Sequence, residues 1–293
     1  MKKIIVVTGG AGFVGSNLIE ILLKKTNLKI ISIDNYSSGY KTNHIQNHRV
    51  KYLNSDTLEI EKKLRAYKNK INAIFHFGEF SRIYQSFKKL DQCLKSNVQG
   101  TQAVFKFCLE NNIKLIYSAT SATIGNEGKD KNLSPYAFTK AKNLEFLENL
   151  KKWFKLKFEV IYFYNVYGPR QICRGDMATV VGIFEDHYLN KKKIPVVRPG
   201  TQTRRFTHII DTVEVCYEAW RKNKNKHYYI SGKKDYSVIE LARMFNKKIK
   251  YLPKRPGERY KSFVQNKSIN KNFLFRSGKI QLKDYVINFL KKN

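Results

Sequence analysis

The sequence predicts an α/β protein built on a doubly wound parallel sheet, followed by a smaller α/β C-terminal domain. Three observations support this prediction. Short apolar runs rich in β-branched residues alternate with longer amphipathic stretches. A glycine-rich turn follows the first apolar run, and the regular alternation ends after Asn165. The chain of 293 residues is long enough for one large domain with a smaller partner.

The strands and helices of the large domain follow from this alternation. The apolar runs are short and nearly continuous, as expected of strands that are buried on both faces of a parallel sheet. In the first amphipathic stretch, Val14, Leu18, Ile21 and Leu22 form a stripe at helical spacing. We predict strands at residues 4–8, 30–33, 50–53, 73–77, 115–117 and 160–164, and helices at 12–25, 90–110 and 136–153.

The turn after the first predicted strand has the spacing of a dinucleotide-binding loop. Gly10, Gly12 and Gly15 follow the G-x-G-x-x-G pattern between a strand and a helix. Such glycines permit a tight turn, a close approach of the backbone to a pyrophosphate and close packing of helix on strand, and the helix N-terminus offers free N–H groups to the anion. We therefore assign five residues of this turn to cofactor binding: Gly9, Gly12, Phe13, Val14 and Gly15.

An acidic residue ends the second predicted strand. Asp34 lies 19 residues after Gly15, which is the distance at which a carboxylate accepts hydrogen bonds from the adenosine ribose hydroxyls. A 2′-phosphate would be repelled there and no arginine follows immediately, so we predict NAD as the cofactor rather than NADP. The alternative is that Asp34-Asn35 forms a plain turn.

Tyr136 and Lys140 are candidates for acid–base chemistry. They stand four residues apart at the start of a predicted helix, so their side chains share one face. A lysine cation near a tyrosine lowers the pKa of the phenol because it favours the phenolate. The tyrosine can then exchange protons near neutral pH. Taken alone the pair could be an ordinary surface pair, but the glycine turn upstream gives it a redox cofactor to work with.

The domain boundaries follow from breaks in the pattern. Tyr167-Gly168-Pro169 ends the alternation, and turns follow at residues 198–200 and 255–257. We predict an NAD-binding domain of the Rossmann type at residues 1–166, to which residues 206–232 return with a last strand at 227–230. Residues 167–205 and 233–293 are predicted to form a substrate-binding domain over the carboxyl ends of the strands.

The composition restricts the partners and the location of the protein. The net charge is +33, but the lysines are scattered and no nucleic-acid-binding motif accompanies them. We interpret the charge as a solvated surface with an AT-rich codon bias, or as attraction of an anionic substrate, and not as nucleic-acid binding.

No apolar run is long enough to cross a membrane. Cys93, Cys108, Cys173 and Cys216 form no Cys-x-x-Cys pair, so we expect reduced thiols, a cytoplasmic protein and no metal site.

Taken together, these motifs resemble the extended short-chain dehydrogenase/reductase superfamily. Residues 8–15, the Tyr136-x-x-x-Lys140 pair and the segment 164–169 carry the resemblance, which extends over nearly the whole chain. The similarity is greatest to the NAD-dependent nucleotide-sugar epimerase/dehydratase group that contains UDP-glucose 4-epimerase. The resemblance implies further cofactor contacts from Asn35, Asp56, Thr57, Phe77, Gly78, Glu79, Asn97, Tyr136, Lys140, Tyr164 and Val166. It implies substrate contacts from Ser81, Arg82, Thr120, Asn165, Arg204, Arg255 and Glu258, with Arg204 and Arg255 on the diphosphate.

The segment 117–125 separates the reaction types of this group. Counted back from Gly125, Thr120 matches the catalytic Ser/Thr of the family, although a shift of one residue would make it Ser121. The dehydratases and decarboxylases of the family carry a glutamate two residues later, and this chain has Ala122. An alkyl group cannot transfer a proton. The resemblance therefore implies an epimerase or a simple oxidoreductase.

We expect an epimerase that inverts C4 of a nucleotide sugar through a transient 4-keto sugar, with Thr120, Tyr136 and Lys140 as catalytic residues. A dehydrogenase or 4-reductase with net redox turnover is the alternative, and a non-catalytic NAD-binding regulator is a more remote one. The resemblance also implies a homodimer formed through helices near residues 90–110 and 136–153.

Three residues depart from the family pattern: Glu79 where a small residue is usual, Ile124 and Arg205. Glu79 is expected either to contact the substrate or nicotinamide, or to face solvent.

Overall fold

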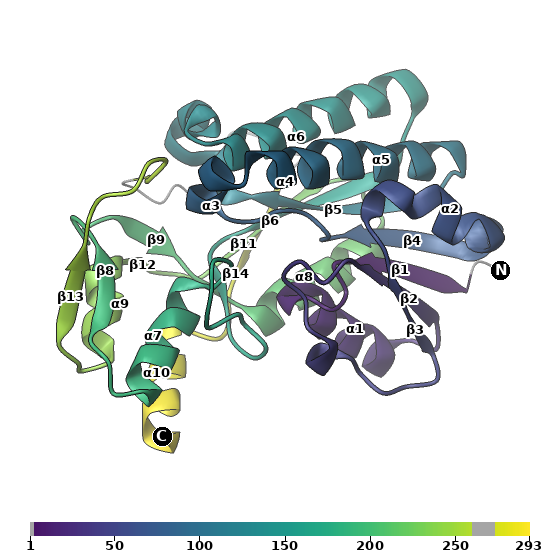
Figure 1. Ribbon diagram of the computed structural model, residues 1–293. Helices are drawn as coiled ribbons and strands as arrows, with labels where there is room; N and C mark the ends of the chain where they lie inside the picture. The colour runs from purple at the N-terminus through teal and green to yellow at the C-terminus, as the bar shows by residue number, and fades with distance from the viewer. Residues whose placement is uncertain (1–2, 260–272) are drawn as a thin grey trace.

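The computed structural model describes residues 3–259 and 273–293, and its main feature is an eight-stranded parallel sheet (Figure 1). The strand order is β14-β11-β6-β5-β4-β1-β2-β3, which is the order of a doubly wound fold extended at one edge. The prediction of the fold class is confirmed. The strands are β1 (Ile4–Thr8), β2 (Lys29–Asp34), β3 (Val50–Asn54), β4 (Ile71–His76), β5 (Lys114–Thr120), β6 (Phe158–Phe163), β11 (His227–Ser231) and β14 (Phe273–Ser277).

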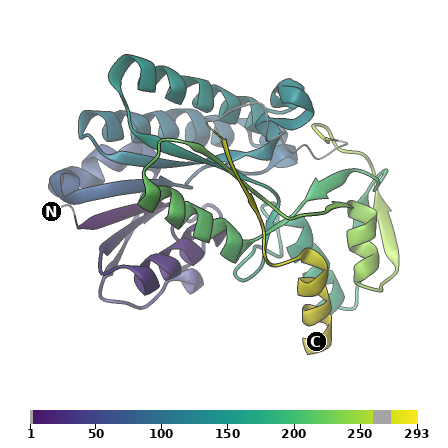
Figure 2. The same cartoon turned by 180° about the vertical axis from the view of Figure 1, so that it is seen from behind.

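Helices cover both faces of the sheet, as Figures 1 and 2 show. α1 (Phe13–Lys25) and α8 (Ile209–Lys222) pack on one face and share a core with Ile5, Val7 and Ile161 of the strands. α2 (Ile60–Leu64), α5 (Thr101–Glu110) and α6 (Pro135–Phe154) pack on the other face. Burial on both faces explains the nearly continuous apolar runs of the central strands.

The helix predicted at residues 90–110 is interrupted in the structure. It consists of α4 (Leu90–Leu94), a π-helical turn at Lys95–Gly100 and α5. The wider turn contains Asn97, which is fully buried. Its side chain accepts from the amide of Phe80 at 2.6 Å and donates to the Phe80 carbonyl at 3.0 Å. The π turn therefore fixes the loop that follows β4, which the apolar spacing alone did not indicate.

A smaller group of elements lies beyond the carboxyl ends of the strands. It has its own core, which includes Phe184, Val196, Leu241 and Phe245. Its members are α7 (Val180–Leu189), β8 (Ile194–Val197), β9 (Thr203–Arg205), β12 (Asp235–Ser237), α9 (Val238–Met244), β13 (Ile249–Leu252) and α10 (Leu282–Lys292). Short strands β7 (Val166–Tyr167) and β10 (Thr207–His208) pair where the chain passes between the two groups.

The chain returns to the large sheet twice after residue 205. β11 pairs with β6, as predicted for the last strand. β14 then pairs with β11, although it belongs to the segment 233–293 that we assigned to the second domain. The division into domains at the stated boundaries stays a prediction.

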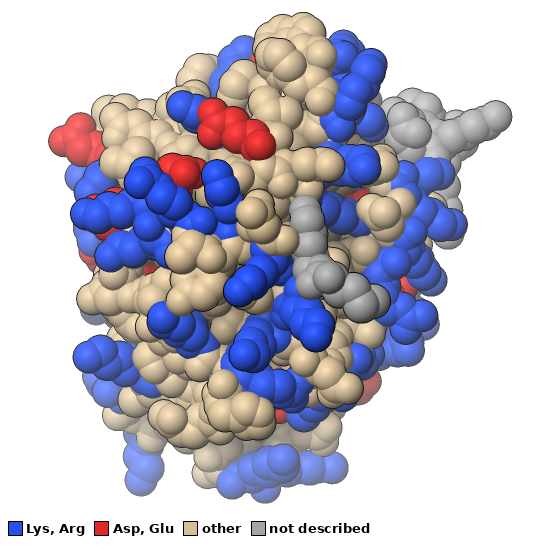
Figure 3. All heavy atoms as spheres, turned by 90° about the vertical axis from the view of Figure 1, so that its right-hand side faces the viewer, with Lys and Arg blue, Asp and Glu red and all other residues tan. Residues whose placement is uncertain are grey.

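The described surface carries many cations. In Figure 3, lysine and arginine side chains are spread over the visible face, with few acidic side chains among them. The interpretation of this charge stays a prediction. Among residues 3–259 and 273–293, no helix is long and apolar enough to cross a bilayer.

Candidate functional site

A cavity of about 600 Å³ opens where the parallel strands end and the smaller group of elements begins. Its walls come from the turn after β1, the ends of β2, β4, β5 and β6, the start of α6, and the segments around residues 177–181 and 256–259. Of the predicted site residues, these line it: Gly9, Gly12, Phe13, Val14, Gly15, Asp34, Asn35, Asp56, Thr57, Phe77, Gly78, Glu79, Ser81, Arg82, Thr120, Tyr136, Lys140, Asn165, Val166, Arg204 and Glu258.

The glycine turn is packed so closely that side chains are excluded. A Cβ atom on Gly15 would lie 2.1 Å from the Gly9 carbonyl oxygen, and Gly9 itself has a φ of +69°. The N-cap of α1 is Gly12, and no described side chain caps the helix there. The first amides of α1 are therefore left for an anion at the helix N-terminus.

Asp34 ends β2 at the edge of the cavity. Its carboxylate accepts from the amides of Ala11 at 2.9 Å and Tyr36 at 2.8 Å. Burial raises the pKa of Asp34 above its ordinary value. The carboxylate is thus held by the glycine turn itself. Together, the free helix N-terminus, the close-packed glycines and this acid fit a dinucleotide with an unphosphorylated ribose.

Asp56 lies beyond Asp34 along the same wall. It accepts from the Asn35 amide nitrogen at 2.6 Å and pairs with Lys95 at 3.2 Å. These contacts lower the pKa of Asp56, with the Asn35 hydrogen bond as the largest cause. Asp34, Asn35 and Asp56 would hold the adenosine end of the cofactor.

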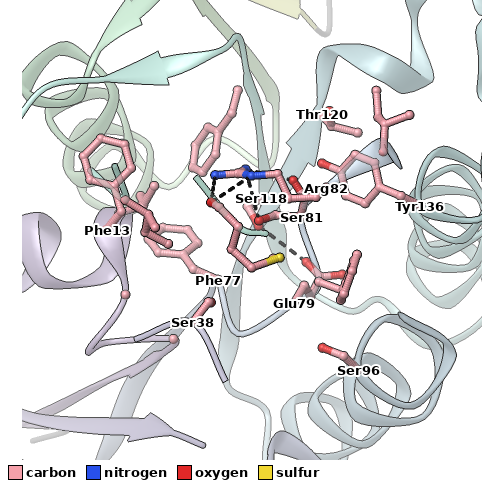
Figure 4. A pocket seen from close by; sticks show the side chains of 18 of the residues that line it. Phe13, Ser38, Phe77, Glu79, Ser81, Arg82, Ser96, Ser118, Thr120 and Tyr136 are labelled. Atoms are coloured by element: carbon pink, nitrogen blue, oxygen red, sulfur yellow. Dashed lines mark hydrogen bonds between the residues drawn. The ribbon is translucent and has the colours of Figure 1, made fainter. Parts of the chain in front are cut away.

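Tyr136 lies at the other end of the cavity, at the start of α6. Ser134 caps this helix by accepting from the Ala137 amide at 3.1 Å, and Pro135 follows at the first helical position. The cap fixes the direction in which the Tyr136 side chain enters the cavity. In Figure 4, Thr120 and Tyr136 lie on one side of the pocket and Phe13 and Phe77 on the other.

The pKa of Tyr136 differs from the expectation. Burial raises it above the ordinary value, and the hydrogen-bond contact with Thr120 is the largest opposing effect. The cations that lower the Tyr136 pKa are Arg82 and Arg259, whereas Glu79 raises it. Lys140, which we expected to lower this pKa, is not among its main causes, and the Lys140 ammonium is engaged by Glu79 and the Ser118 carbonyl.

Lys140 is held by a buried carboxylate that belongs to Glu79. The ammonium donates to Glu79 and to the Ser118 carbonyl. The two side chains are 4% and 3% exposed, so Glu79 does not face solvent. The sequence marked Glu79 as a departure from the family pattern, but it gave no sign of this partner.

Two arginines, Arg204 and Arg259, line the cavity on the side of the smaller group of elements. Arg204 donates to the Arg259 carbonyl at 2.6 Å and pairs with Glu258 at 3.0 Å. Arg259 is 7% exposed, and its Nη1 donates to the Ser121 carbonyl at 2.9 Å. The Nε of Arg259 has no partner among the described residues. Sequence reasoning missed Arg259, although it follows the Arg-Pro-Gly-Glu segment directly.

Three predicted residues do not line the cavity. Arg255 lies outside it, with its guanidinium carbon 4.8 Å from the centre of the Tyr84 ring. Asn97 is buried behind the wall, where it holds Phe80. Tyr164 is buried, and its hydroxyl has no partner among the described residues. Arg259 thus occupies the cavity position that the prediction gave to Arg255.

Arg82 extends from the loop after β4 into the cavity (Figure 4). Its Nε donates to the Met177 carbonyl at 2.9 Å, and its Nη1 donates to the Ser81 carbonyl at 3.0 Å. No carboxylate in the described part of the chain pairs with it. Its charge therefore stays available to the cavity and to Tyr136.

Ala122 lines the cavity close to Thr120 and is almost fully buried. The position at which the resemblance places a second acid in dehydratases therefore carries a methyl group in this pocket. Among the described residues, no cluster of histidine, cysteine or acidic side chains suits a metal ion.

Comparison with known proteins gives consistent matches. The model of the NAD dependent epimerase/dehydratase family matches residues 5–231. The ADP-L-glycero-D-manno-heptose-6-epimerase of Brachyspira hyodysenteriae is 31% identical over 228 residues, which are 72% of this chain and 70% of that protein.

Two solved structures share the fold over nearly their whole length. The UDP-glucose 4-epimerase of Thermotoga maritima with UDP-glucose superimposes with a TM-score of 0.86 at 24% identity, over 99% of both chains. The UDP-glucuronic acid 4-epimerase of Bacillus cereus with UDP-glucuronic acid and NAD gives 0.84 at 25% identity, over 99% of both chains.

The glycine turn makes a direct prediction. Gly15→Ala would place a Cβ against the Gly9 carbonyl, so we expect the free energy of unfolding to fall by about 1–3 kcal/mol and NAD affinity to fall at least ~10-fold. Denaturant unfolding and calorimetric NAD titration measure these effects. Gly175→Ala is the control: its φ of +78° makes the alanine strained, but its Cβ would meet nothing within 4 Å and it does not line the cavity. It should lower the free energy of unfolding and keep NAD affinity. Unchanged affinity in Gly15→Ala would contradict the role of the close packing.

Proposed function

The chain belongs to the NAD-dependent epimerase/dehydratase family, and from this premise we propose that it is a nucleotide-sugar epimerase that inverts C4 through a transient 4-keto sugar. The observation that carries the proposal is the pairing of Tyr136 with Thr120 in a pocket where Ala122 stands in place of a further acid. One proton-transfer group is sufficient for reversible oxidation at C4. An elimination would need a second acid or base.

Each residue has a role in this proposal. Tyr136 is neutral near pH 7 in the free protein, and its phenolate form, favoured by Arg82 and Arg259, takes the proton of the sugar 4-hydroxyl. Thr120 shares this proton through the contact that lowers the Tyr136 pKa. NAD, when bound, supplies the hydride acceptor and donor. Lys140 holds the nicotinamide ribose. Arg259 contacts the diphosphate, to which a planar guanidinium group is suited, and Arg204 holds the Arg259 carbonyl.

Turnover of a nucleotide-sugar panel tests this proposal. The purified protein is incubated without added cofactor, and the sugar protons are followed by NMR. We expect C4 epimers to interconvert without net NADH formation, and Tyr136→Phe to lower the rate at least ~10²-fold because the proton acceptor is lost. Net NADH accumulation would favour a dehydrogenase instead. Full activity of Tyr136→Phe would exclude the catalytic role.

The pH profile gives an independent prediction. The phenolate form of Tyr136 is active, and burial raises the pKa of Tyr136 above its ordinary value, so activity falls on the alkaline side as the pH drops through that raised pKa. Arg82 lowers that pKa, and Arg82→Gln should therefore move the acidic limb of kcat/KM by ~1 unit to higher pH. Arg82→Lys keeps the charge and should keep the limb. If the acidic limb of the kcat/KM profile has the same midpoint in Arg82→Gln as in the wild type, Arg82 does not act on Tyr136.

We also propose a homodimer formed through the helices of one face. α4 and α6 carry the exposed apolar residues Leu90, Leu94, Phe138, Trp153 and Phe154. Apolar side chains gathered on one helical layer favour association more than scattered ones do.

Light scattering after gel filtration tests the dimer. The pair Leu94→Glu with Phe138→Glu places charges on both helices, so we expect the dimer to dissociate to a monomer. Tyr251→Glu changes a similarly exposed residue on β13 and should leave the mass unchanged. A monomeric wild-type protein would exclude this proposal.

A further inference from the structure

The Glu79–Lys140 ion pair is the most completely enclosed charged contact at the cavity wall. Oε1 of Glu79 accepts from the Tyr117 hydroxyl at 3.0 Å and the Thr101 hydroxyl at 3.1 Å. Oε2 accepts from Lys140, with the Ser118 hydroxyl at 3.5 Å. A buried ion pair is stable only when further hydrogen bonds satisfy the charges, and both carboxylate oxygens meet this condition.

A chain of hydrogen bonds leads to Glu79, and in it each group donates to the next. The Thr8 hydroxyl donates to Nδ1 of His76 at 2.7 Å, and Nε2 of His76 faces the Thr101 hydroxyl at 3.0 Å. This tautomer, which we assign from the network, leaves the Thr101 proton free to point at Glu79. Burial lowers the pKa of His76 to about 4, so the ring is neutral. The chain of donors therefore links the end of β1 to the carboxylate that holds Lys140.

Among the described residues, the cysteine, tyrosine and histidine side chains around the pair are neutral near pH 7 in the free protein. Burial raises the pKa of Cys93 on α4 to about 11, and it raises the pKa values of Tyr117 on β5 and Tyr136 on α6. His76 on β4 is neutral as well. Within the described part of the chain, Glu79 is thus the acid that balances the Lys140 cation. Burial lowers the pKa of Lys140, and Glu79 is the largest opposing cause.

We propose that Glu79 is a positioning residue for Lys140: its carboxylate fixes the ammonium at the Ser118 carbonyl and keeps it protonated inside a cavity wall that excludes water. The inference rests on the proposed role of Lys140 in holding the nicotinamide ribose, and it is independent of which sugar is the substrate. Because a small residue is usual at position 79 in the family that the sequence resembles, this device is a property of this chain.

A second buried pair provides a matched control. Lys114 and Glu159 lie 2.9 Å apart with side chains 11% and 0% exposed. Glu159 also accepts from the amides of Asn225 and Lys226 at 2.9 and 2.8 Å. Neither residue of this pair lines the cavity. The Lys114–Glu159 pair is therefore buried like the Glu79–Lys140 pair, but it lies away from the cavity.

Competitive acetylation measures the charge of each lysine in the intact protein. The protein is treated with trace acetic anhydride between pH 6 and 11, and the modified peptides are quantified by mass spectrometry. Removing an opposite charge shifts a pKa by ~1 unit or more, so we expect the Lys140 midpoint in Glu79→Gln to lie at least ~1 unit below that of the wild type. In Glu159→Gln, Lys114 should shift and Lys140 should not. Equal Lys140 midpoints in wild type and Glu79→Gln would overturn the proposal.

Binding of NAD supplies the second readout. Calorimetric titration at pH 7 and pH 9 should give wild-type and Glu159→Gln affinities that change little between the two pH values. Glu79→Gln should lose more NAD affinity at pH 9 than at pH 7, because its Lys140 gives up the proton at a lower pH than in the wild type. Glu79→Asp, which restores the charge, should recover part of it. Loss of affinity to the same extent at both pH values would indicate a merely structural role and overturn the proposal.

The outcomes separate this inference from the proposed function. If no nucleotide sugar is turned over but Lys140 titrates as expected, the inference stands and the assigned reaction fails. If the sugars interconvert but the Lys140 midpoint is insensitive to Glu79, only the inference fails. Should Glu79→Gln not fold, Glu79→Asp decides, because it keeps the charge but moves it away from Lys140: a Lys140 midpoint equal to that of the wild type would overturn the proposal, and a lower one would support it.

Discussion

The contact between Gly15 and the Gly9 carbonyl is the constraint on which the site depends. It brings the start of α1 against the end of β1, so the first amides of the helix face the cavity. Asp34 then accepts from the amide of Ala11 within the same turn. Since all strands of the sheet are parallel, their carboxyl ends meet at this edge and bring Thr120 and Lys140 to the same cavity.

The cations at this edge of the sheet have two different roles: one is fixed in position, and the others lower the pKa of Tyr136. Lys140, the cation nearest in sequence to Tyr136, is balanced by Glu79 inside the wall. Arg82 and Arg259 come from loops and keep their charges for the cavity, where they lower the Tyr136 pKa. Lys140 is consequently fixed in position, and the electrostatic effect on the phenol comes from residues that enter from the loop after β4 and from the smaller group of elements.

Residue spacing in the sequence predicted those site residues that belong to a single helix or to a single strand–turn–helix unit. The glycine turn, Asp34 and the Tyr136–Lys140 pair depend on spacing within one strand–turn–helix unit or one helix. The partner of Lys140 could not be found this way, because Glu79 is 61 positions distant in the chain. Arg255 and Arg259 also show what the sequence alone does not predict. Gly257 has a φ of +74° and turns the loop between them, so only the folded loop decides which arginine enters the cavity.

The state of the two cavity arginines bears on how the proposed substrate would be held. Arg204 is already satisfied by Glu258 and by the carbonyls of Thr203 and Arg259. Arg259 has its Nη1 on Ser121 and its Nε without a partner among the described residues, and an unpaired buried donor is costly. A diphosphate oxygen at this Nε would remove that cost without breaking an ion pair, whereas binding at Arg204 would compete with Glu258. In the proposed function, Arg259 is therefore the arginine already prepared for the substrate, and Arg204 holds the backbone that carries it.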